Sequence, residues 1–424
     1  MPFMLPAPRS SREEELMKNN NKNSIIPVLL GADLGAYSMA RSFAEAGVGK
    51  SKIFSRAKLA MTSTSAFVTQ EVNAQLDDCD HAVPELIRFK EANRGSDLIL
   101  VPCADWYMEM LQYARDALLG HYFFMIPNFE VWRTVSDKAS FGYILDRYGI
   151  PRPKGAVFDS TLSDFFKKGL TLRPPFVVKP SDSSEYYRHK FEGMKKVYFA
   201  HSLGEARRII EEIYSHGYSK KVLLQEYIGG KDAYASVLTV FISSEGTAKR
   251  AVLGDVLLEE RRGSARGNYS AIITRPLDSV SYKLINMLEG IGYRGFANFD
   301  ILHDGMGSYC LELNPRLGRS FDYVRLSGMS PASLLISELR GENIKESFYY
   351  PEYLWRAVNK RTAIACAENE NLIGKAEELE RIGAVSTPYD GRRDGGLLRR
   401  TYVFTHLLRS GHRFLKDKNR GETL

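Results

Sequence analysis

Apolar and amphipathic segments alternate through the first third of the chain. Residues 25–30 form an apolar run, Ile-Ile-Pro-Val-Leu-Leu, and a helical pattern follows over 36–46. Another apolar run, 97–102, reads Asp-Leu-Ile-Leu-Val-Pro. Strands that alternate with helices form parallel sheets that helices cover on both faces. We therefore expect an α/β domain over residues 25–130.

The hydrophobic pattern changes after residue 130. Short apolar or alternating runs predict strands, several of them antiparallel, at 175–180, 222–227, 234–243, 251–258, 297–302 and 308–313. Residues 203–214 have the period of an amphipathic helix. This mixture predicts an α+β domain over 131–345. The pattern is less regular over 346–424, which we expect to be a C-terminal extension.

The two ends of the chain are its most polar parts. Residues 18–24 are nearly all Asn and Lys and cannot bury a core, so we expect a flexible arm over 1–24. Between residues 392 and 422, nine Lys or Arg face three acidic residues. Most of the formal net charge of +7 therefore sits in a basic tail.

The basic tail also contains apolar residues: Phe404, Leu407, Leu408, Phe414 and Leu415. A segment of this kind can make a peripheral contact with an anionic membrane, although packing against the protein body is the more common arrangement. The tail has no recognised nucleic-acid-binding motif and few stacking aromatics. Nucleic acid is therefore not an expected partner.

Composition excludes several classes of protein. The 424 residues are 44% apolar and 26% charged, which is ordinary for a globular chain of about two to four domains. No apolar stretch approaches the roughly 20 residues that span a bilayer, and the first residues lack a secretory signal. The four cysteines and eight histidines have no CxxC or HExxH spacing, which argues against a zinc enzyme. We expect a soluble, cytoplasmic protein with reduced thiols.

Two glycine turns match nucleotide-binding loops only in part. Residues 47–51, Gly-Val-Gly-Lys-Ser, lack the first glycine of a P-loop, because Ala44 stands at that position. Gly31 and Gly35 lie between a strand and a helix, where backbone N–H groups favour an anion. Their spacing is equally typical of a tight turn without a ligand.

The strongest candidate for chemistry is the predicted hairpin around residues 300–316. Glu312 and Asn314 are two apart on one strand and therefore share a face. If the strands pair across the short turn, Asp300 lies within about one register step of Glu312. Carboxylate and amide oxygens suit Mg²⁺, which completes its shell with water and phosphates. Arg316 follows on the same alternation and adds a cation beside the metal.

Two lysines and a glycine turn add features that a nucleotide site needs. Lys179 ends an apolar strand, and the proline after it gives the charge a fixed place. Lys138 opens a helical segment earlier in the chain. The strand 222–227 runs into a Gly-Gly turn, and free backbone groups past a strand end can read an adenine edge. Each of these signals alone also fits an ordinary exposed strand end.

In their order and separation, these segments resemble the ATP-grasp fold. The resemblance covers about residues 25–345 and implies a Rossmann-like pre-ATP-grasp domain followed by the ATP-grasp domain. It implies that Asp300, Glu312 and Asn314 bind Mg²⁺. It also implies that Arg316 stabilises the acyl-phosphate and the tetrahedral species that follows.

The same resemblance implies where ATP binds. Lys138 and Lys179 would contact phosphate oxygens, with Lys179 acting in catalysis as well. Glu226 and the backbone of Ile228 would hold adenine, and Asp232 would hold the ribose.

The loop after the strand-end lysine departs from the family pattern. Residues 181–196 contain a single glycine, Gly193, whereas the phosphate loop of the family is usually richer in glycine. The residues expected to cover the phosphates in its place are Ser181, Ser183, Ser184, Arg188, His189 and Lys190.

The resemblance implies an ADP-forming carboxylate–amine ligase. ATP phosphorylates a carboxylate, and an amine attacks the resulting acyl-phosphate. Phosphoryl transfer needs positioning and charge neutralisation more than covalent chemistry by the protein. Lysines, magnesium and an arginine supply both, and the sequence contains no Ser-His-Asp or Cys-His set.

Within the family, three stretches look most like the D-aspartate ligases, which act on a peptidoglycan precursor peptide: 31–43, 292–300 and 314–320. Candidate contacts to the acid or the peptide, each of which also fits a surface or packing role, are Arg41, Asn268, Arg294 and Arg319. A ligase for another amino acid or a small peptide product is one alternative. A non-catalytic ATP-binding switch is another, against which the full set of metal and phosphate residues argues. The oligomeric state stays open.

Overall fold

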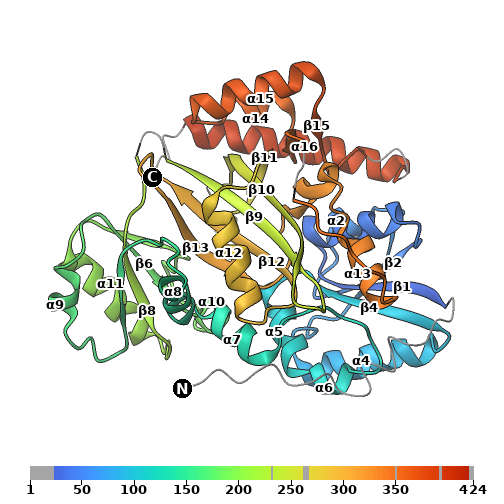
Figure 1. The fold of residues 1–424 in the computed structure, drawn as a ribbon, viewed down its shortest axis with the longest axis horizontal. Coiled ribbons are helices and arrows are strands. Elements are labelled where there is room, and N and C mark those ends of the chain that lie inside the picture. Colours follow the sequence, from blue (N-terminus) through green and yellow to red (C-terminus); the bar gives the residue numbers. More distant parts are fainter. Residues whose placement is uncertain (1–22, 231–232, 261–266, 349–350, 391–393, 420–424) are drawn as a thin grey trace.

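The computed structural model describes most of the chain, namely residues 23–230, 233–260, 267–348, 351–390 and 394–419 (Figure 1). The first sheet has four parallel strands in the order β3-β2-β1-β4. Their bounds are β1 (Ser24–Leu30), β2 (Ser51–Ser55), β3 (Val68–Val72) and β4 (Ser96–Pro102). The predicted runs 25–30 and 97–102 are the neighbouring strands β1 and β4, so the α/β expectation is confirmed.

Helices cover both faces of this sheet, as the buried strands require. One face packs against α2 (Leu34–Glu45), and the other packs against α4 (Cys79–Ala92) and α5 (Asp105–Tyr113). Asp33 caps α2 by accepting a hydrogen bond from the Ala36 backbone N–H at 3.2 Å. The remaining short helices of this part are α3 (Ala60–Ser63), α6 (Arg115–Leu118) and α7 (Phe129–Ser136).

A small antiparallel sheet follows, with its strands in the order β5-β8-β6-β7. Its elements are β5 (Gly155–Phe158), α9 (Phe165–Gly169), β6 (Phe176–Pro180), α10 (Ser183–Arg188), β7 (Tyr198–Ala200), α11 (Leu203–Ser215) and β8 (Val222–Glu226). All apolar side chains of its core lie between residues 156 and 224. We call this unit the small lobe.

The large sheet has seven strands in the order β13-β12-β9-β10-β11-β14-β15. Its bounds are β9 (Tyr234–Ile242), β10 (Ala248–Glu259), β11 (Tyr269–Arg275), β12 (Gly295–His303), β13 (Ser308–Asn314), β14 (Leu354–Arg356) and β15 (Val385–Ser386). Its pairs are antiparallel except β14–β15. The predicted hairpin across residues 303–307 is the pair β12–β13.

The large sheet has a different neighbour on each face. On one face, α8 (Lys138–Arg147) and α12 (Ser279–Gly290) share a core with β9, β10, β12 and β13. On the other, a second core joins the sheet to α2, to the 3-10 helix η2 (Phe321–Ser327) and to α13 (Pro331–Leu339). The first sheet and the large sheet thus share a continuous hydrophobic core.

The C-terminal segment is more regular than its sequence pattern indicates. Strands β14 and β15 add to the large sheet, and three helices follow or flank them: α14 (Lys360–Ala365), α15 (Glu370–Ile382) and α16 (Leu397–Asn419). The expected boundary at 345 stays a prediction, although these two strands lie beyond it. No helix in the described part of the chain is both long enough and apolar enough to cross a membrane.

Candidate active site

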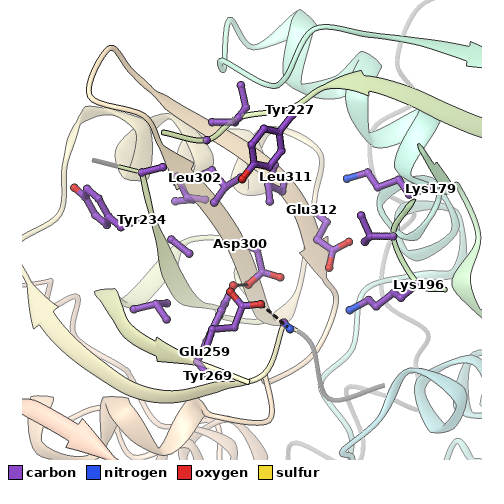
Figure 2. A pocket seen from close by; sticks show the side chains of 18 of the residues that line it. Lys179, Lys196, Tyr227, Tyr234, Glu259, Tyr269, Asp300, Leu302, Leu311 and Glu312 are labelled. Atoms are coloured by element: carbon purple, nitrogen blue, oxygen red, sulfur yellow. Dashed lines mark hydrogen bonds between the residues drawn. The ribbon is translucent and has the colours of Figure 1, made fainter. Parts of the chain in front are cut away.

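Two carboxylates face each other across the β12–β13 hairpin (Figure 2). Asp300 lies directly opposite Glu312, and a register shift follows, because Ile301 pairs with Cys310. This bulge turns both Leu311 and Glu312 towards the same cavity. The Tyr269 hydroxyl donates to Asp300 Oδ1 at 2.9 Å. The strand register therefore places Asp300 and Glu312 close together, as predicted from the sequence.

Three lysines face this carboxylate pair. Lys138 Nζ lies 3.5 Å from Glu312 Oε2 and donates to Ser183 Oγ at 3.1 Å. Lys179, at the end of β6, and Lys196, just before β7, reach the cavity from the small lobe (Figure 2). The residue before Lys138, Asp137, caps α8 by accepting from the Ser140 N–H and so fixes the start of that helix.

The charges of this cluster shift one another's pKa values. Burial, with help from the Lys138 and Lys196 charges, lowers the pKa of Lys179 to about 8. Burial alone raises the pKa of Glu312, but the three lysines hold it well below its usual range. Burial and the neighbouring Glu312 raise the pKa of Asp300. A cation bound between the carboxylates would stabilise the ionised form of Asp300 and so lower its pKa.

A cavity of about 400 Å³ extends from this cluster between the small lobe and the large sheet. Such a volume suits a nucleotide-sized ligand. At the end away from the carboxylates it is lined by the linker after β8 and by apolar or aromatic residues: Tyr227, Ile228, Gly229, Gly230, Tyr234, Leu302 and Leu311. We call the apolar and aromatic part of the lining the adenine slot. This part and the lysines match the two halves of ATP.

One of the residues predicted to hold adenine or ribose lies at this slot. Ile228 lines the cavity. The Glu226 side chain instead accepts from the Arg173 backbone N–H at 2.9 Å, and Glu226 is not among the lining residues. Asp232 lies outside the described residues.

The loop expected to cover the phosphates contains a short helix, α10. Of the candidates with described side chains, Ser183 lines the cavity, whereas Arg188 pairs with Glu109 of α5 at 3.0 Å. Tyr186 and Tyr187 of α10 also line it. Ser184 lies in α10, and its side chain is outside the described part.

A second, smaller cavity of about 110 Å³ adjoins the first. The two share Asp300, Glu312, Lys196, Gly267 and Tyr269 as walls. The small cavity also contains two arginines, Asn268 and the predicted metal ligand Asn314. The Asn314 amide donates to Asp300 Oδ2 at 3.3 Å.

Both arginines of the small cavity have acidic partners. Arg316 makes a two-point pair with Asp105, with Nε–Oδ1 at 2.7 Å and Nη2–Oδ2 at 2.8 Å. Arg319 lies 3.4 Å from Glu260 and 3.8 Å from Asp33. Asp105 begins α5, so the first sheet and its helices supply acidic groups to a site built on the large sheet.

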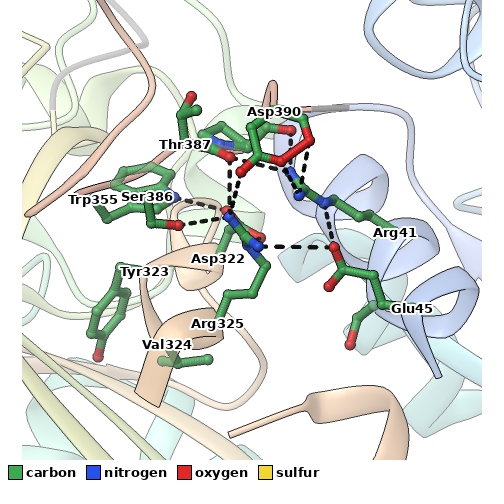
Figure 3. Close-up of polar contacts among 12 residues, drawn as sticks. Arg41, Glu45, Asp322, Tyr323, Val324, Arg325, Trp355, Ser386, Thr387 and Asp390 are labelled. Carbon is green, nitrogen blue, oxygen red and sulfur yellow. Dashed lines mark hydrogen bonds and ion pairs between the residues drawn. The ribbon is translucent and has the colours of Figure 1, made fainter. Parts of the chain in front are cut away.

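The other two substrate candidates lie elsewhere. Arg41 is 4% exposed and occupied by Glu45, Asp390 and the backbone oxygens of Thr387 and Pro388 (Figure 3). Arg294 donates to the Ser244 and Tyr293 backbone oxygens. These are contacts of packing residues. A packing role is the alternative to substrate binding that the sequence leaves open for both arginines.

Three residues of the site were not predicted from the sequence: Asp105, Lys196 and Tyr269. Asp105 and Tyr269 meet Arg316 and Asp300 only through long-range packing. Lys196 stands in a Lys-Lys pair after the loop glycine, which marks a positive charge near the loop without showing where it points.

The donor set fits Mg²⁺ rather than a softer metal. Asp300, Glu312 and Asn314 offer hard oxygens beside a cavity with room for phosphates. In the described part of the chain, no three His, Cys, Asp or Glu side chains gather into a metal-binding group. Asn314 and ligand oxygens would therefore complete the shell around the two carboxylates.

No protein-family model matches the chain. It is 28% identical over 370 residues to D-aspartate ligase of Enterococcus faecium (strain Aus0004), which covers 84% of this chain and 88% of that protein. It is 26% identical over 249 residues to the carbamoyl phosphate synthase large chain of Thermus thermophilus, which covers 56% of this chain and 22% of that protein.

Solved structures show the same fold at low sequence identity. The biotin carboxylase domain of Hydrogenobacter thermophilus 2-oxoglutarate carboxylase, in complex with MgADP, ADP and bicarbonate, aligns with a TM-score of 0.61 and 16% identity over 76% of this chain and 71% of that one. N5-carboxyaminoimidazole ribonucleotide synthetase, as an ADP complex, aligns with a TM-score of 0.56 and 14% identity over 78% and 81%. The chain therefore has the ATP-grasp fold, and it resembles the ADP-forming ligases that share this fold.

Proposed function

We propose that this protein joins the β-carboxylate of D-aspartate to the side-chain amine of a lysine-containing stem peptide, with cleavage of ATP to ADP and phosphate. The observation that carries the proposal is the small cavity beside the carboxylate pair, which contains two arginines within one amino-acid-sized space. A monocarboxylic acid needs one cation there, whereas a dicarboxylic acid uses two. The likeness to a D-aspartate ligase over most of both chains supports the same choice.

The chain's own residues supply the charges that the reaction needs. Lys138, Lys179 and Lys196 line the large cavity and would hold phosphate oxygens there, and Lys196 also lines the small cavity. Magnesium, when bound at Asp300 and Glu312, would neutralise the phosphates. Arg316, fixed by Asp105, would stabilise charge on the reacting carboxylate.

The reaction balances without any further co-reactant. A carboxylate oxygen attacks the γ-phosphorus and ADP leaves. The amine then attacks the acyl carbon, phosphate leaves, and the amine proton passes to water or phosphate. Arg319 would hold the second carboxylate of the acid and so set which of the two reacts.

Phosphate release tests the proposal directly. The protein is given MgATP, hydroxylamine as a trap for acyl-phosphates, and each L- or D-amino acid in turn. We expect release above background with D-aspartate, and much less with D-asparagine or D-alanine. Release with a different acid would keep the ligase class and overturn the substrate. ATP binding without release for any acid would favour the ATP-binding switch.

A further inference from the structure

The C-terminal helix α16 carries a stripe of exposed apolar side chains. Four large apolar side chains of this helix are exposed: Leu397 (83%), Leu398 (70%), Phe404 (64%) and Leu408 (55%). Residues 397, 404 and 408 fall within about 40° of one another around the helix axis, and Leu398 widens the stripe on one side. Large apolar side chains exposed along one side of a helix in this way indicate an interaction surface.

The opposite side of α16 is fixed to the protein body. Arg399 is buried, pairs with Asp394 at 3.0 Å and stacks on the Tyr37 ring at 4.0 Å. Phe414 is also buried, in a core shared with α14 and α15. Because these anchors hold the inner face, the helix cannot rotate to hide its stripe.

The charges along the stripe have one sign. Each exposed Asp, Glu, Lys or Arg side chain that the structure describes on α16 is basic: Arg400, Arg409, Arg413, Lys416 and Lys418. The helix's acidic residue, Asp417, is buried. Arg400 lies on one side of the stripe, and Arg409 and Lys416 lie on the other.

We propose that α16 is a peripheral membrane-docking helix that lies parallel to an anionic lipid surface. Leu397, Phe404 and Leu408 would enter the acyl boundary, and the flanking arginines and lysines would contact lipid phosphates. A second copy of this chain fits less well, because a two-fold contact over the stripe brings like charges together. The surface is thus matched to a negatively charged apolar partner.

Helix α16 also contacts a residue next to the small cavity of the active site. Arg413 of α16 pairs with Glu260 at 3.0 Å, and Glu260 is a partner of Arg319 in the small cavity. Arg413 projects from the side of α16 opposite the stripe, so α16 would lie between the membrane and the acid-binding arginine.

Vesicle flotation of the full chain tests the proposal. We expect binding to phosphatidylcholine vesicles that contain phosphatidylglycerol, little binding to phosphatidylcholine alone, and weakening with salt. The double variant F404E/L408E should bind at least about tenfold less, and R400Q/R409Q should bind less and lose most of its salt dependence. The matched control is L170E, since Leu170 is 75% exposed beyond α9 on the small lobe.

Three results would overturn the proposal. One is an absence of binding to the anionic vesicles. Another is equal binding by F404E/L408E and the unmodified chain. The third is a dimer in light scattering that F404E/L408E converts to a monomer, which would assign the stripe to a second copy. An unchanged melting temperature shows that the variants are folded, because all the substituted side chains are exposed.

Discussion

Replacing Asp105 by asparagine tests whether an acidic residue next to the first sheet positions the arginine of the active site. The aspartate holds Arg316 by two short contacts of 2.7 and 2.8 Å. Asparagine keeps the size but turns an NH₂ group towards the guanidinium, so one contact is lost and the charge is removed. Arg316 would then sample positions away from the reacting carboxylate.

The expected loss follows from the exposure of this pair. A hydrogen bond between charged groups contributes about 1.5–3 kcal/mol. The Asp105 side chain is 55% exposed, so solvent screening reduces this to about 1–2 kcal/mol. If the arginine acts mainly in the transition state, kcat with D-aspartate should fall about 5- to 30-fold while KM for ATP stays within about twofold.

A second pair in the chain supplies a matched control. Arg152 holds Asp146 by two contacts of 2.7 Å each, and Asp146 is 52% exposed. This pair lines neither of the two site cavities. The variant D146N should leave kcat unchanged. Full activity of D105N, or an equal loss of activity in D146N, would exclude a positioning role for Asp105.

The other predictions concern the cations of the site and the metal. Arg319→Gln should raise KM for D-aspartate at least about tenfold with little change in KM for ATP, whereas Arg294→Gln should change neither; equal effects of both would remove Arg319 from the acid site. Because burial lowers the pKa of Lys179 to about 8, the lysine is charged below that pH and neutral above it. ATP affinity should therefore fall as pH rises through about 8, and K179R should abolish the fall; a profile that K179R does not change would exclude this lysine as its origin. Chelation of divalent ions should stop phosphate release, and Mg²⁺ should restore it; full activity in the chelator would contradict the carboxylate site.

Local pattern was sufficient to predict the hairpin and its carboxylates. Alternation with a short turn fixes both the face and the approximate register of Asp300, Glu312 and Asn314. The order of strands and helices likewise predicts a parallel sheet followed by antiparallel ones. These features depend on neighbours along the chain, which the sequence displays directly.

The remaining features depend on contacts between distant segments. Tyr269 and Asp105 reach the site only after separate sheets have packed, and nothing near them in sequence marks that destination. Strands β14 and β15 have only three and two residues, too few to show a period. The sequence of α16 also lacks a clear helical period of apolar residues, because Arg399 and Asp417 are buried while Phe404 and Leu408 are exposed.

The small lobe has a core of its own and can therefore unfold separately from the rest of the protein. Its apolar contacts stay within residues 156–224, whereas the first and large sheets share theirs. Two cores of this kind can open as distinct cooperative units, with different amide hydrogen-exchange protection. A nucleotide held by Lys179 on one unit and by β12 on the other would join them energetically. The free protein would then unfold in two thermal transitions. Saturation with MgATP would merge them into a single transition at a higher melting temperature.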